Sequence, residues 1–582
     1  MKQKPVIYQI FTRLFTNDNP TCVPGGTIAQ NGSGKLNNIT PRVLKSIKEL
    51  GITHVWYTGV IEHATKSDYS AFGITPDNPH VVKGQAGSPY AIKDYYDIDP
   101  DLAENVAERM KEFEALVDRT HKAGMKVIID FVPNHTARNY HSDARPAGIR
   151  DLGEDDDPNL FFGHDNNYYY ITRQLFSPSV DMGQGDDAYV EFPAKATGDD
   201  CFSAFPGVNN WYDTVKLNYG VDYGDGSRHF QPIPSTWFKM LNILRFWASK
   251  GVDGFRCDMV HMVPLEFWEW AKPNVKDRYP DIIFIAEIYD TYLYRPFIER
   301  GGFDYLYDKV NLYDTLIGIE CANYSAATIT SSWQRTDGLG PHMLNFLENH
   351  DEQRFASRFK AGDPAKVYPS LVVSSTINTG PMMIYAGQEL GEKADDAEGY
   401  SGLDGRTTIF DYWSVPTLRR WYNGGKPDGS LLTPAEKHLR ARYAHILGLL
   451  NKEKAFSEGK FFDLMYVNYQ NPTLNPHRHY VYMRSHEGET IFVAANFGDT
   501  PAELKVNIPM HAFEYLNIPQ GHAPAKELQS GETDDKMLIP DGTFDVNVPA
   551  HDAVMWKFRH ADVRPQRHET AATTPRPKKS KR

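Results

Sequence analysis

Four short apolar runs in this sequence end in side chains that can transfer protons or carry charge. Residues 254–258 end with Arg256 and Asp258, whose spacing of two directs both side chains to one side of a strand. An isolated pair of this kind is most simply a structural salt bridge. Three more runs nevertheless end in the same way, in chain order: 130–135 with His135, 284–287 with Glu287, and 346–351 with His350 and Asp351. Paired carboxyls could cleave an acetal, because one protonates the leaving oxygen while the other meets the positive carbon.

The segments around these runs predict the elements that position them. Short apolar strands alternate with helical segments, which is typical of a (β/α)8 barrel, where side chains at the carboxyl ends of the strands face the active site. Thr40 and Pro41 provide a start signal for the first helix. The expected strands cover residues 6–10, 53–57, 126–131, 252–257, 282–287, 303–307, 343–347 and 381–389, and the expected helices cover 41–50, 104–123, 235–250, 264–279, 364–378 and 434–450.

Interruptions of this alternation predict the domain organisation. Residues 59–100 form a long loop rich in Gly, Pro and Asp, and residues 134–223 show no helical period, which indicates an inserted irregular domain after the third strand. The barrel then comprises residues 1–133 and 224–452. Residues 453–560 contain short alternating strands at 480–483, 490–494, 504–508 and 553–558, typical of an antiparallel β-sandwich. Residues 561–582 are polar, Pro-rich and basic, which predicts a disordered tail.

The four runs closely resemble the signature regions of the α-amylase family, glycoside hydrolase family 13. The resemblance implies that Asp258 is the nucleophile, Glu287 the general acid/base and Asp351 the third carboxylate. It also implies that the sugar is bound by Arg256, His135, His350, His261 and Tyr90. Tyr90 lies in the segment 88–97, which is similar to the one that supplies a stacking tyrosine in the family, although a tyrosine that only packs the loop would look the same.

The resemblance implies a retaining hydrolase that cuts α-1,4 links in starch-derived maltodextrins. Asp258 and Glu287 end adjacent expected strands, about 4.8 Å apart in a sheet, which favours the short carboxyl spacing of a retaining mechanism. Arg256 is expected to keep Asp258 ionised. Two alternatives stay open: a transferase on the same barrel, which passes the glycosyl unit to another sugar, and a non-catalytic glucan-binding relative, which the intact carboxyls disfavour.

Departures from the family pattern concern the metal. The segment that usually reads Gln-Pro-Asp-Leu-Asn is here Thr-Val-Lys-Leu-Asn, so Lys216 stands where an aspartate often binds calcium, and His261-Met262 replaces a common Lys-His pair. An ammonium only donates hydrogen bonds and cannot ligate a cation that prefers oxygen. We therefore expect the usual calcium site beside Asn134 to be lost. Calcium elsewhere stays open, and the chemistry requires no cofactor.

Composition limits the partners. The net charge of −13 disfavours nucleic acid, because phosphate neutralisation needs a basic face. No stretch has the length and apolar character of a membrane span or a signal peptide, so we expect a cytoplasmic protein without a membrane partner. Four widely spaced cysteines indicate thiols of a reducing compartment. The expected partner is an α-glucan oligosaccharide or polysaccharide, and the oligomeric state is not determined by the sequence.

Overall fold

Eight parallel strands close into a barrel in a computed structural model that describes residues 3–560. Each strand pairs with its neighbours in chain order, and the last pairs with the first, so the predicted (β/α)8 barrel is confirmed. The predicted tail at 561–582 lies outside the described residues. The strands are β1 (Val6–Phe11), β2 (His54–Thr58), β5 (Lys126–Phe131), β10 (Gly254–Cys257), β11 (Ile283–Ala286), β12 (Tyr305–Tyr307), β13 (Met343–Phe346) and β14 (Met382–Tyr385).

The barrel strands are almost entirely buried. All six residues of β1 and all four of β14 are inaccessible to solvent or nearly so. Strands covered on both faces must be apolar throughout, which is why these runs do not alternate between polar and apolar residues. Buried side chains of the strands and of the surrounding helices form one continuous core.

Helices surround the barrel, and their starts follow local capping rules. The Thr40 side chain accepts a hydrogen bond from the Val43 N–H, and Thr433 forms a reciprocal capping box with Glu436. The helix expected at 104–123 begins only at 109, because 106–108 form a 3-10 turn capped by Asn105. The main helices are α3 (Pro41–Lys48), α4 (Arg109–Lys122), α5 (Ser235–Ser249), α6 (Leu265–Lys276), α7 (Tyr294–Glu299), α8 (Asp314–Cys321), α9 (Thr328–Arg335), α10 (Tyr368–Thr376), α11 (Pro416–Tyr422) and α12 (Pro434–Lys452).

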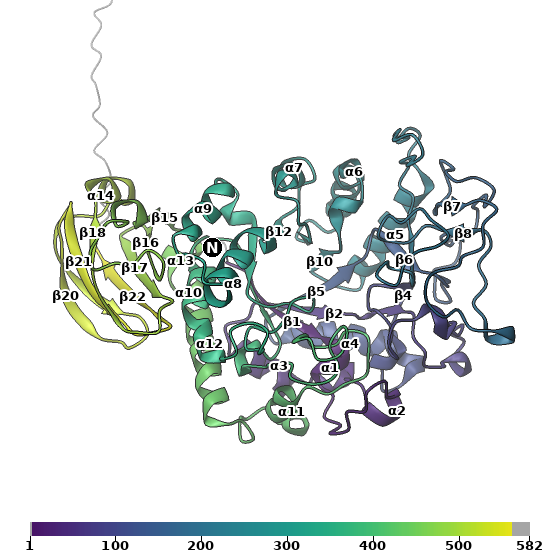
Figure 1. Ribbon diagram of the computed structural model, residues 1–582, viewed down its shortest axis with the longest axis horizontal. Coiled ribbons are helices and arrows are strands. Elements are labelled where there is room, and N and C mark those ends of the chain that lie inside the picture. The colour runs from purple at the N-terminus through teal and green to yellow at the C-terminus, as the bar shows by residue number, and fades with distance from the viewer. Residues whose placement is uncertain (1–2, 561–582) are drawn as a thin grey trace, which may run out of the picture.

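Two long segments leave the barrel on the side away from the C-terminal sheets (Figure 1). The loop after β2, expected to be irregular, contains an antiparallel pair, β3 (Ile61–His63) and β4 (Ile92–Ile98). The segment after β5 contains two further two-stranded sheets: β6 (His135–Ala137) pairs with β9 (Thr214–Lys216), and β7 (Tyr170–Ile171) pairs with β8 (Ala194–Lys195). A small separate cluster of Ile171, Phe176, Ala194 and Ala204 packs its interior.

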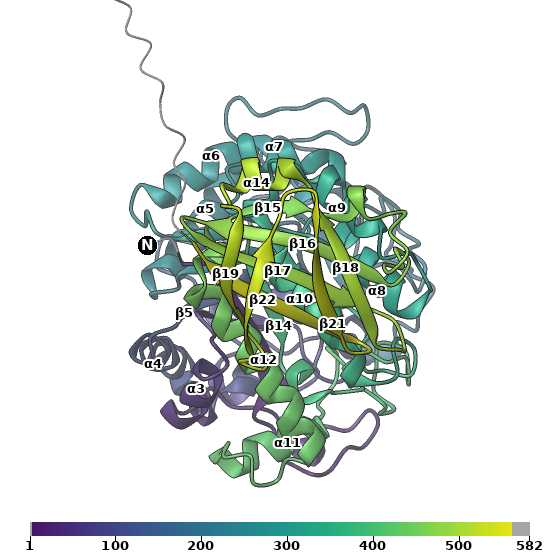
Figure 2. The same ribbon diagram turned by 90° about the vertical axis from the view of Figure 1, so that its left-hand side faces the viewer.

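The C-terminal strands form two antiparallel sheets at the opposite end of the molecule (Figure 1), and Figure 2 shows them facing the viewer. Phe492 and Phe544 pack with ring centroids 4.5 Å apart, one from each sheet, so this part of the chain is a sandwich as predicted. Only four of its eight strands were expected. The larger sheet contains β15 (Lys460–Asp463), β16 (His479–His486), β17 (Glu489–Asn496), β22 (Asp552–Arg559), β19 (Gly521–Glu527) and β20 (Thr533–Leu538), and the smaller contains β18 (Ala502–Ile508) and β21 (Gly542–Val548).

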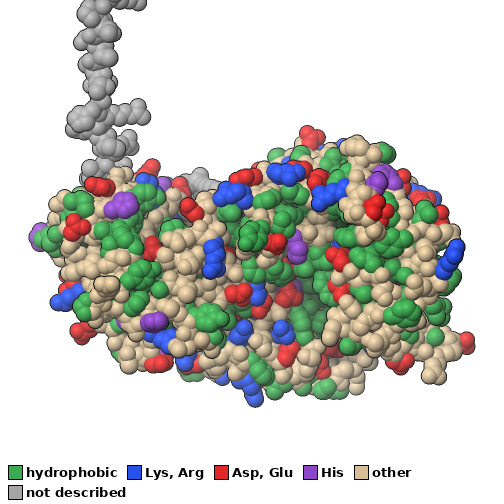
Figure 3. Space-filling view, turned by 45° about the horizontal axis from the view of Figure 1, so that its top comes forward, with side chains coloured by type: hydrophobic (Ala, Val, Ile, Leu, Met, Phe, Trp, Pro, Cys, Tyr) green, Lys and Arg blue, Asp and Glu red, His purple; other side chains and the backbone are tan. Residues whose placement is uncertain are grey.

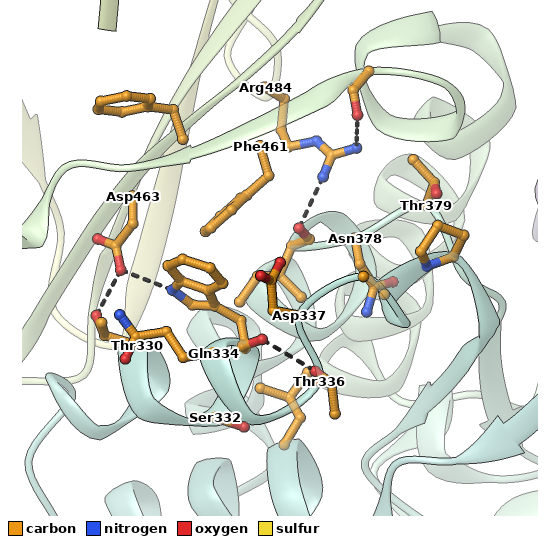
Figure 4. Close-up of a pocket in the computed structure, with 18 of the residues that line it drawn as sticks. Thr330, Ser332, Gln334, Thr336, Asp337, Asn378, Thr379, Phe461, Asp463 and Arg484 are labelled. Atoms are coloured by element: carbon orange, nitrogen blue, oxygen red, sulfur yellow. Dashed lines mark hydrogen bonds between the residues drawn. The ribbon is translucent and has the colours of Figure 1, made fainter. Parts of the chain in front are cut away.

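The sandwich meets the barrel around a cavity of about 640 Å³ between α9 and β15 (Figure 4). Asp463 of β15 accepts hydrogen bonds from the Thr330 hydroxyl at 2.6 Å and the Trp333 indole at 2.9 Å. On the other side, the buried Arg484 of β16 donates to the carbonyl of Ile377, just after α10, at 2.8 Å. These side chains fix the sandwich to the barrel.

Among the described helices, none combines the length and the apolar character that a membrane crossing would need.

Candidate active site

The carboxyl ends of neighbouring barrel strands bring the expected site residues together. Cys257 of β10 pairs with Ala286 of β11, so the residues that follow them, Asp258 and Glu287, leave the barrel at the same level. They line a pocket of about 310 Å³, together with Tyr90, His135, Trp211, Tyr289, Asp351 and Tyr400. In the space-filling view, several acidic side chains gather in a hollow near the middle of the molecule (Figure 3).

Arg256 lies beneath this pocket and contacts two of its carboxyls. Its Nη1 is 2.7 Å from Asp258 Oδ1, and its Nη2 is 2.7 Å from Glu287 Oε2. Asp130, one strand away on β5, is 3.5 Å from Nη1. Since the side chain of Arg256 is only 1% exposed, its charge acts on these carboxylates with little screening by water.

The protonation of Asp258 is set by opposing effects. Burial, and next the negative charge of Glu287, raises the pKa of Asp258 well above its usual value, and Arg256 lowers it. The expectation that Arg256 keeps Asp258 ionised is therefore incomplete, because burial and the charge of Glu287 act against Arg256.

Glu287 is held by two donors. The Tyr289 hydroxyl donates to Oε1 at 2.6 Å, and the Met259 N–H donates to Oε2 at 3.0 Å. Met259 has a φ of 42°, in the left-handed region that non-glycine residues avoid. The turn after β10 thus accepts local strain and directs this N–H at the carboxylate, which fixes the position of Glu287.

Asp351 and His350 are connected by a second set of hydrogen bonds. The Tyr400 hydroxyl donates to Asp351 Oδ1 at 3.0 Å. Burial, and next the charge of Arg256, lowers the pKa of His350 to about 3, so its ring is neutral. Gln9 Nε2 can only donate and lies 2.7 Å from His350 Nδ1, which leaves the ring proton on Nε2, 3.2 Å from Asp351 Oδ2.

The expected sugar-binding residues do not all line the pocket around the carboxyls. The Tyr90 ring stacks on His350 with centroids 5.2 Å apart, and His135 lines the same pocket with a pKa lowered to about 3, first by burial and then by Lys216. His261 does not line this pocket. It lines the adjoining hollow of about 810 Å³, which shares Trp211 and Met259 with the first pocket.

Several residues of the site were missed or left undecided by sequence reasoning. Tyr289 follows Glu287 by two residues at a strand end, a spacing that could have identified it. Trp211 lies in the inserted segment, where the sequence does not distinguish an aromatic residue of the core from one that contacts sugar. Tyr400 and Gln9 reach the site from a loop after β14 and from β1, and no local pattern marks either of them.

A model of a known protein family matches two stretches of the chain. The family model described as the α-amylase catalytic domain matches residues 9–172 and 234–409 of the chain.

The chain belongs to the α-amylase family, glycoside hydrolase family 13.

Known relatives of this chain have low sequence identity to it and are longer than it is. It is 22% identical to α-amylase 2 of Dictyoglomus thermophilum over 76% of its own length and 64% of that protein. It is 23% identical to neopullulanase 2 of Thermoactinomyces vulgaris and 24% identical to a cyclomaltodextrin glucanotransferase of a Bacillus species, over 57% and 53% of those proteins. The chain thus spans between half and two thirds of the length of these relatives.

Solved structures agree in fold with this α-amylase family chain. A maltogenic α-amylase from Thermotoga neapolitana superposes with a TM-score of 0.60 at 20% identity, over 96% of this chain and 99% of that one. An α-amylase from Geobacillus thermoleovorans, complexed with acarbose, superposes with a TM-score of 0.63 at 18% identity, over 96% of this chain and 100% of that one. At this identity the likeness shows the fold alone.

The position beside Asn134, where the α-amylase family resemblance implies calcium, contains a lysine ammonium. Lys216 Nζ donates to Asn134 Oδ1 and to the Met262 carbonyl, the latter at 3.0 Å, and lies 2.7 Å from Asp200 Oδ1. Burial lowers the pKa of Lys216, and Asp200 opposes this shift. The donor set does not fit a divalent cation, because the ammonium uses the oxygens that would bind it.

Proposed function

We propose that this chain is a retaining α-glycosidase that hydrolyses α-1,4-glucosidic bonds in maltodextrins through a covalent glycosyl-enzyme. The observation that carries the proposal is Arg256 with Asp258 and Glu287 each 2.7 Å from its guanidinium. Both carboxyls contact one guanidinium from the ends of adjacent strands, which favours the short carboxyl spacing of a retaining reaction.

Each residue of the pocket has a role in this proposal. Asp258 attacks the anomeric carbon, and Glu287 protonates the leaving oxygen and then activates water. Asp351 and the neutral His350 bind sugar hydroxyls, and Tyr90 offers a ring face beside them. Because Arg256 is a fixed positive charge, Asp258 loses its proton more easily once substrate separates it from Glu287.

The size of the site supports an oligosaccharide or polysaccharide substrate. The pocket around the carboxyls opens past Trp211 and Met259 into the hollow lined by Tyr223, Arg228 and His261. A chain bound across both regions would place sugars on either side of the bond that is cut. Relatives solved with maltose, maltotriose or acarbose support this substrate class.

The direct test uses isosteric variants and maltoheptaose. Asp258→Asn and Glu287→Gln should each lower turnover by about 10²–10⁴-fold or more, with melting temperatures within a few degrees of the unchanged protein. Glu320→Gln, a matched change on α8 away from the pocket, should keep full activity. Turnover near the original level in either pocket variant, in a preparation free of other glycosidases, would contradict the proposal.

The stereochemical outcome tests the mechanism separately. Proton NMR within minutes of mixing should show the α-anomer as the first product, since two inversions retain configuration. A β-anomer formed first would contradict the retaining mechanism and the assignment of Asp258 as the nucleophile.

A glucanotransferase on the same barrel is the second candidate, and the matched cyclomaltodextrin glucanotransferase favours it. Both reactions share the glycosyl-enzyme and differ in whether water or a sugar accepts the glycosyl unit. Chromatography of maltoheptaose products over time separates them, because a transferase makes longer chains early and a hydrolase makes only shorter ones.

The reaction as proposed uses no cofactor. The Lys216 ammonium supplies the positive charge at the position beside Asn134, where it contacts Asp200 and two carbonyl-type oxygens. It thereby bridges β9 and the turn after β10, the same parts of the chain that a cation there would join.

A further inference from the structure

Outside the active site, three carboxylates meet in the interior beneath the loop that carries Tyr90. Among residues 3–560, Glu62, Asp94 and Asp97 form the one group of three acidic, His or Cys side chains that could together hold a metal ion, with one oxygen of each within 4.8 Å of the others. Glu62 lies on β3 opposite Asp94 on β4, and Asp97 lies three residues further along β4, where the register of the strand pair is irregular. All three side chains are buried.

Glu62 points into this group without a hydrogen bond. Its side chain is about 1% exposed, and neither carboxylate oxygen has a hydrogen-bond partner. The nearest cation, Lys93 Nζ, is 3.9 Å from Oε1 and already contacts Asp77 at 3.3 Å and the Thr75 carbonyl. A buried carboxylate with both oxygens unsatisfied costs several kcal/mol unless something binds there.

The two aspartates are oriented by donors and keep oxygen lone pairs free. Asp94 accepts from the Ser142 hydroxyl at 2.6 Å and from the Ala144 N–H at 2.9 Å, and Asp97 is paired with Arg109. A carboxylate offers about four lone-pair positions, and these donors use only part of them. The contacts therefore resemble the outer hydrogen bonds that orient ligands around a metal.

The local charge is negative. Glu62, Asp94, Asp97 and Asp77 face Lys93 and Arg109, which leaves an excess of two negative charges. The carboxylate form of Glu62 thus lacks a compensating positive charge that a divalent cation would supply.

We propose that Glu62, Asp94 and Asp97 bind one calcium ion that joins β3 to β4 and fixes Asp94, which the inserted segment contacts through Ser142 and Ala144. Three carboxylates form an all-oxygen ligand set, which selects a hard cation. Ca²⁺ accepts six to eight oxygens in a flexible geometry, whereas Mg²⁺ is usually bound through one or two carboxylates and keeps several waters, so three buried carboxylates favour Ca²⁺. This site is separate from the position of Lys216.

The consequence for the active site follows from where the ligands lie. Tyr90 precedes β4 by two residues, and Ser142 and Ala144 belong to the segment inserted after β5. In Figure 1, β4 lies beside β6 of that segment. A cation at Asp94 would hold the wall of the pocket that contains Tyr90 and His135.

The experiment measures metal and stability, so it does not depend on the proposed activity. Full-length protein is stripped with EDTA, desalted and titrated with Ca²⁺, with metal content by elemental analysis and melting by calorimetry. The proposal expects one Ca²⁺ per chain and a melting temperature several degrees higher with Ca²⁺ than with EDTA, since a ligand that binds only the folded state stabilises it. Mg²⁺ at the same concentration should give a clearly smaller shift.

Substitutions of the proposed ligands test where the ion binds. Glu62→Gln should weaken Ca²⁺ binding at least tenfold and remove the calcium-dependent shift, and Asp97→Asn should do the same if Glu62→Gln fails to fold. Glu320→Gln, at a half-buried glutamate of α8 outside this group, and Lys216→Met should both keep the shift.

Three outcomes overturn the proposal or its assignment to calcium. Stripped and calcium-loaded protein that melt alike, with Glu62→Gln as stable as either, would show that Glu62 carries a proton instead of facing a cation. Calcium that remains bound in both Glu62→Gln and Asp97→Asn would place the ion elsewhere. An equal response to Mg²⁺ would overturn the assignment to calcium.

Discussion

Arg256 is the residue on which the electrostatics of the pocket depend, because one buried guanidinium contacts Asp258 and Glu287 together. Burial and Glu287 raise the pKa of Asp258, and Arg256 counteracts them. Arg256→Met should therefore raise the pKa of Asp258 further, and a protonated Asp258 is not a nucleophile. The acid limb of the pH–rate profile should move to higher pH, and turnover at pH 7 should fall by about 10²-fold or more.

The variant Arg256→Lys tests the positive charge at this position separately from the shape of the guanidinium group. A lysine keeps the positive charge and loses the fork that binds both carboxyls, so the acid limb should return part of the way while turnover stays low. Identical pH profiles for the unchanged protein and Arg256→Met would contradict this role. Melting curves of both variants show whether the fold is preserved.

Tyr289 positions Glu287 through a hydrogen bond of 2.6 Å. Hydrogen bonds to charged groups contribute about 1.5–3 kcal/mol, so Tyr289→Phe should lower kcat by roughly 10–100-fold with a small change in KM. Tyr292→Phe is the matched control, since this nearby ring is 90% exposed. A loss confined to KM would show that the hydroxyl binds substrate and does not position Glu287.

At the scale of elements, β9 attaches the inserted segment to the barrel through Lys216. Its ammonium contacts Asn134 at the end of β5, Met262 in the turn after β10, and Asp200. Lys216→Met keeps the side-chain volume but leaves the buried acceptors Asn134 and Met262 unpaired, which should cost about 1–3 kcal/mol of unfolding free energy. Urea unfolding followed by tryptophan fluorescence measures this loss.

The control for that change is Lys45→Met, at an exposed position of α3. Surface substitutions of this kind change stability within about 0.5 kcal/mol. Equal stability of the Lys216 and Lys45 variants would mean that Lys216 does not join the two parts of the chain.

At the scale of the whole molecule, Arg484 holds the C-terminal sandwich against the barrel. It donates to the carbonyls of Ile377, Ala455 and Gly459, with no carboxylate among these partners. Arg484→Met would leave three buried acceptors without donors, which should cost about 3 kcal/mol or more. Calorimetry should show the first transition several degrees lower, while kcat/KM measured below that transition should stay unchanged, because the junction shares no residue with the active-site pocket.

Arg358→Met provides the comparison for Arg484→Met. Arg358 forms an exposed pair with Asp395, and such pairs contribute about 0–1 kcal/mol. A first transition for Arg484→Met within a degree of that control would assign the stability of the junction to apolar packing instead.

The sequence by itself determined the barrel and the order of its strands. Residues 6–10, 126–131 and 343–347 are short apolar runs between turn signals, and burial on both faces makes such runs recognisable without any partner. The sequence also placed Asp258, Glu287 and Asp351 at strand ends, since in a parallel barrel the ends of all strands meet at one face. In the sandwich, by contrast, Gly521–Glu527 and Thr533–Leu538 alternate weakly and carry many charges, so their strands were not predicted.

Only the tertiary structure decided what surrounds each site residue. The hydrogen bonds of Gln9 to His350 and of Tyr400 to Asp351 join positions that lie far apart in the chain. The raised pKa of Asp258 depends on burial and on the distance to Glu287, and neither follows from spacing along a strand. The unpaired Glu62 beside Asp94 and Asp97 arises from a strand pair inside a loop that local pattern did not reveal. Local sequence specifies elements through periodicity and turn chemistry, whereas electrostatics and pairing depend on distances that exist only after the chain has packed.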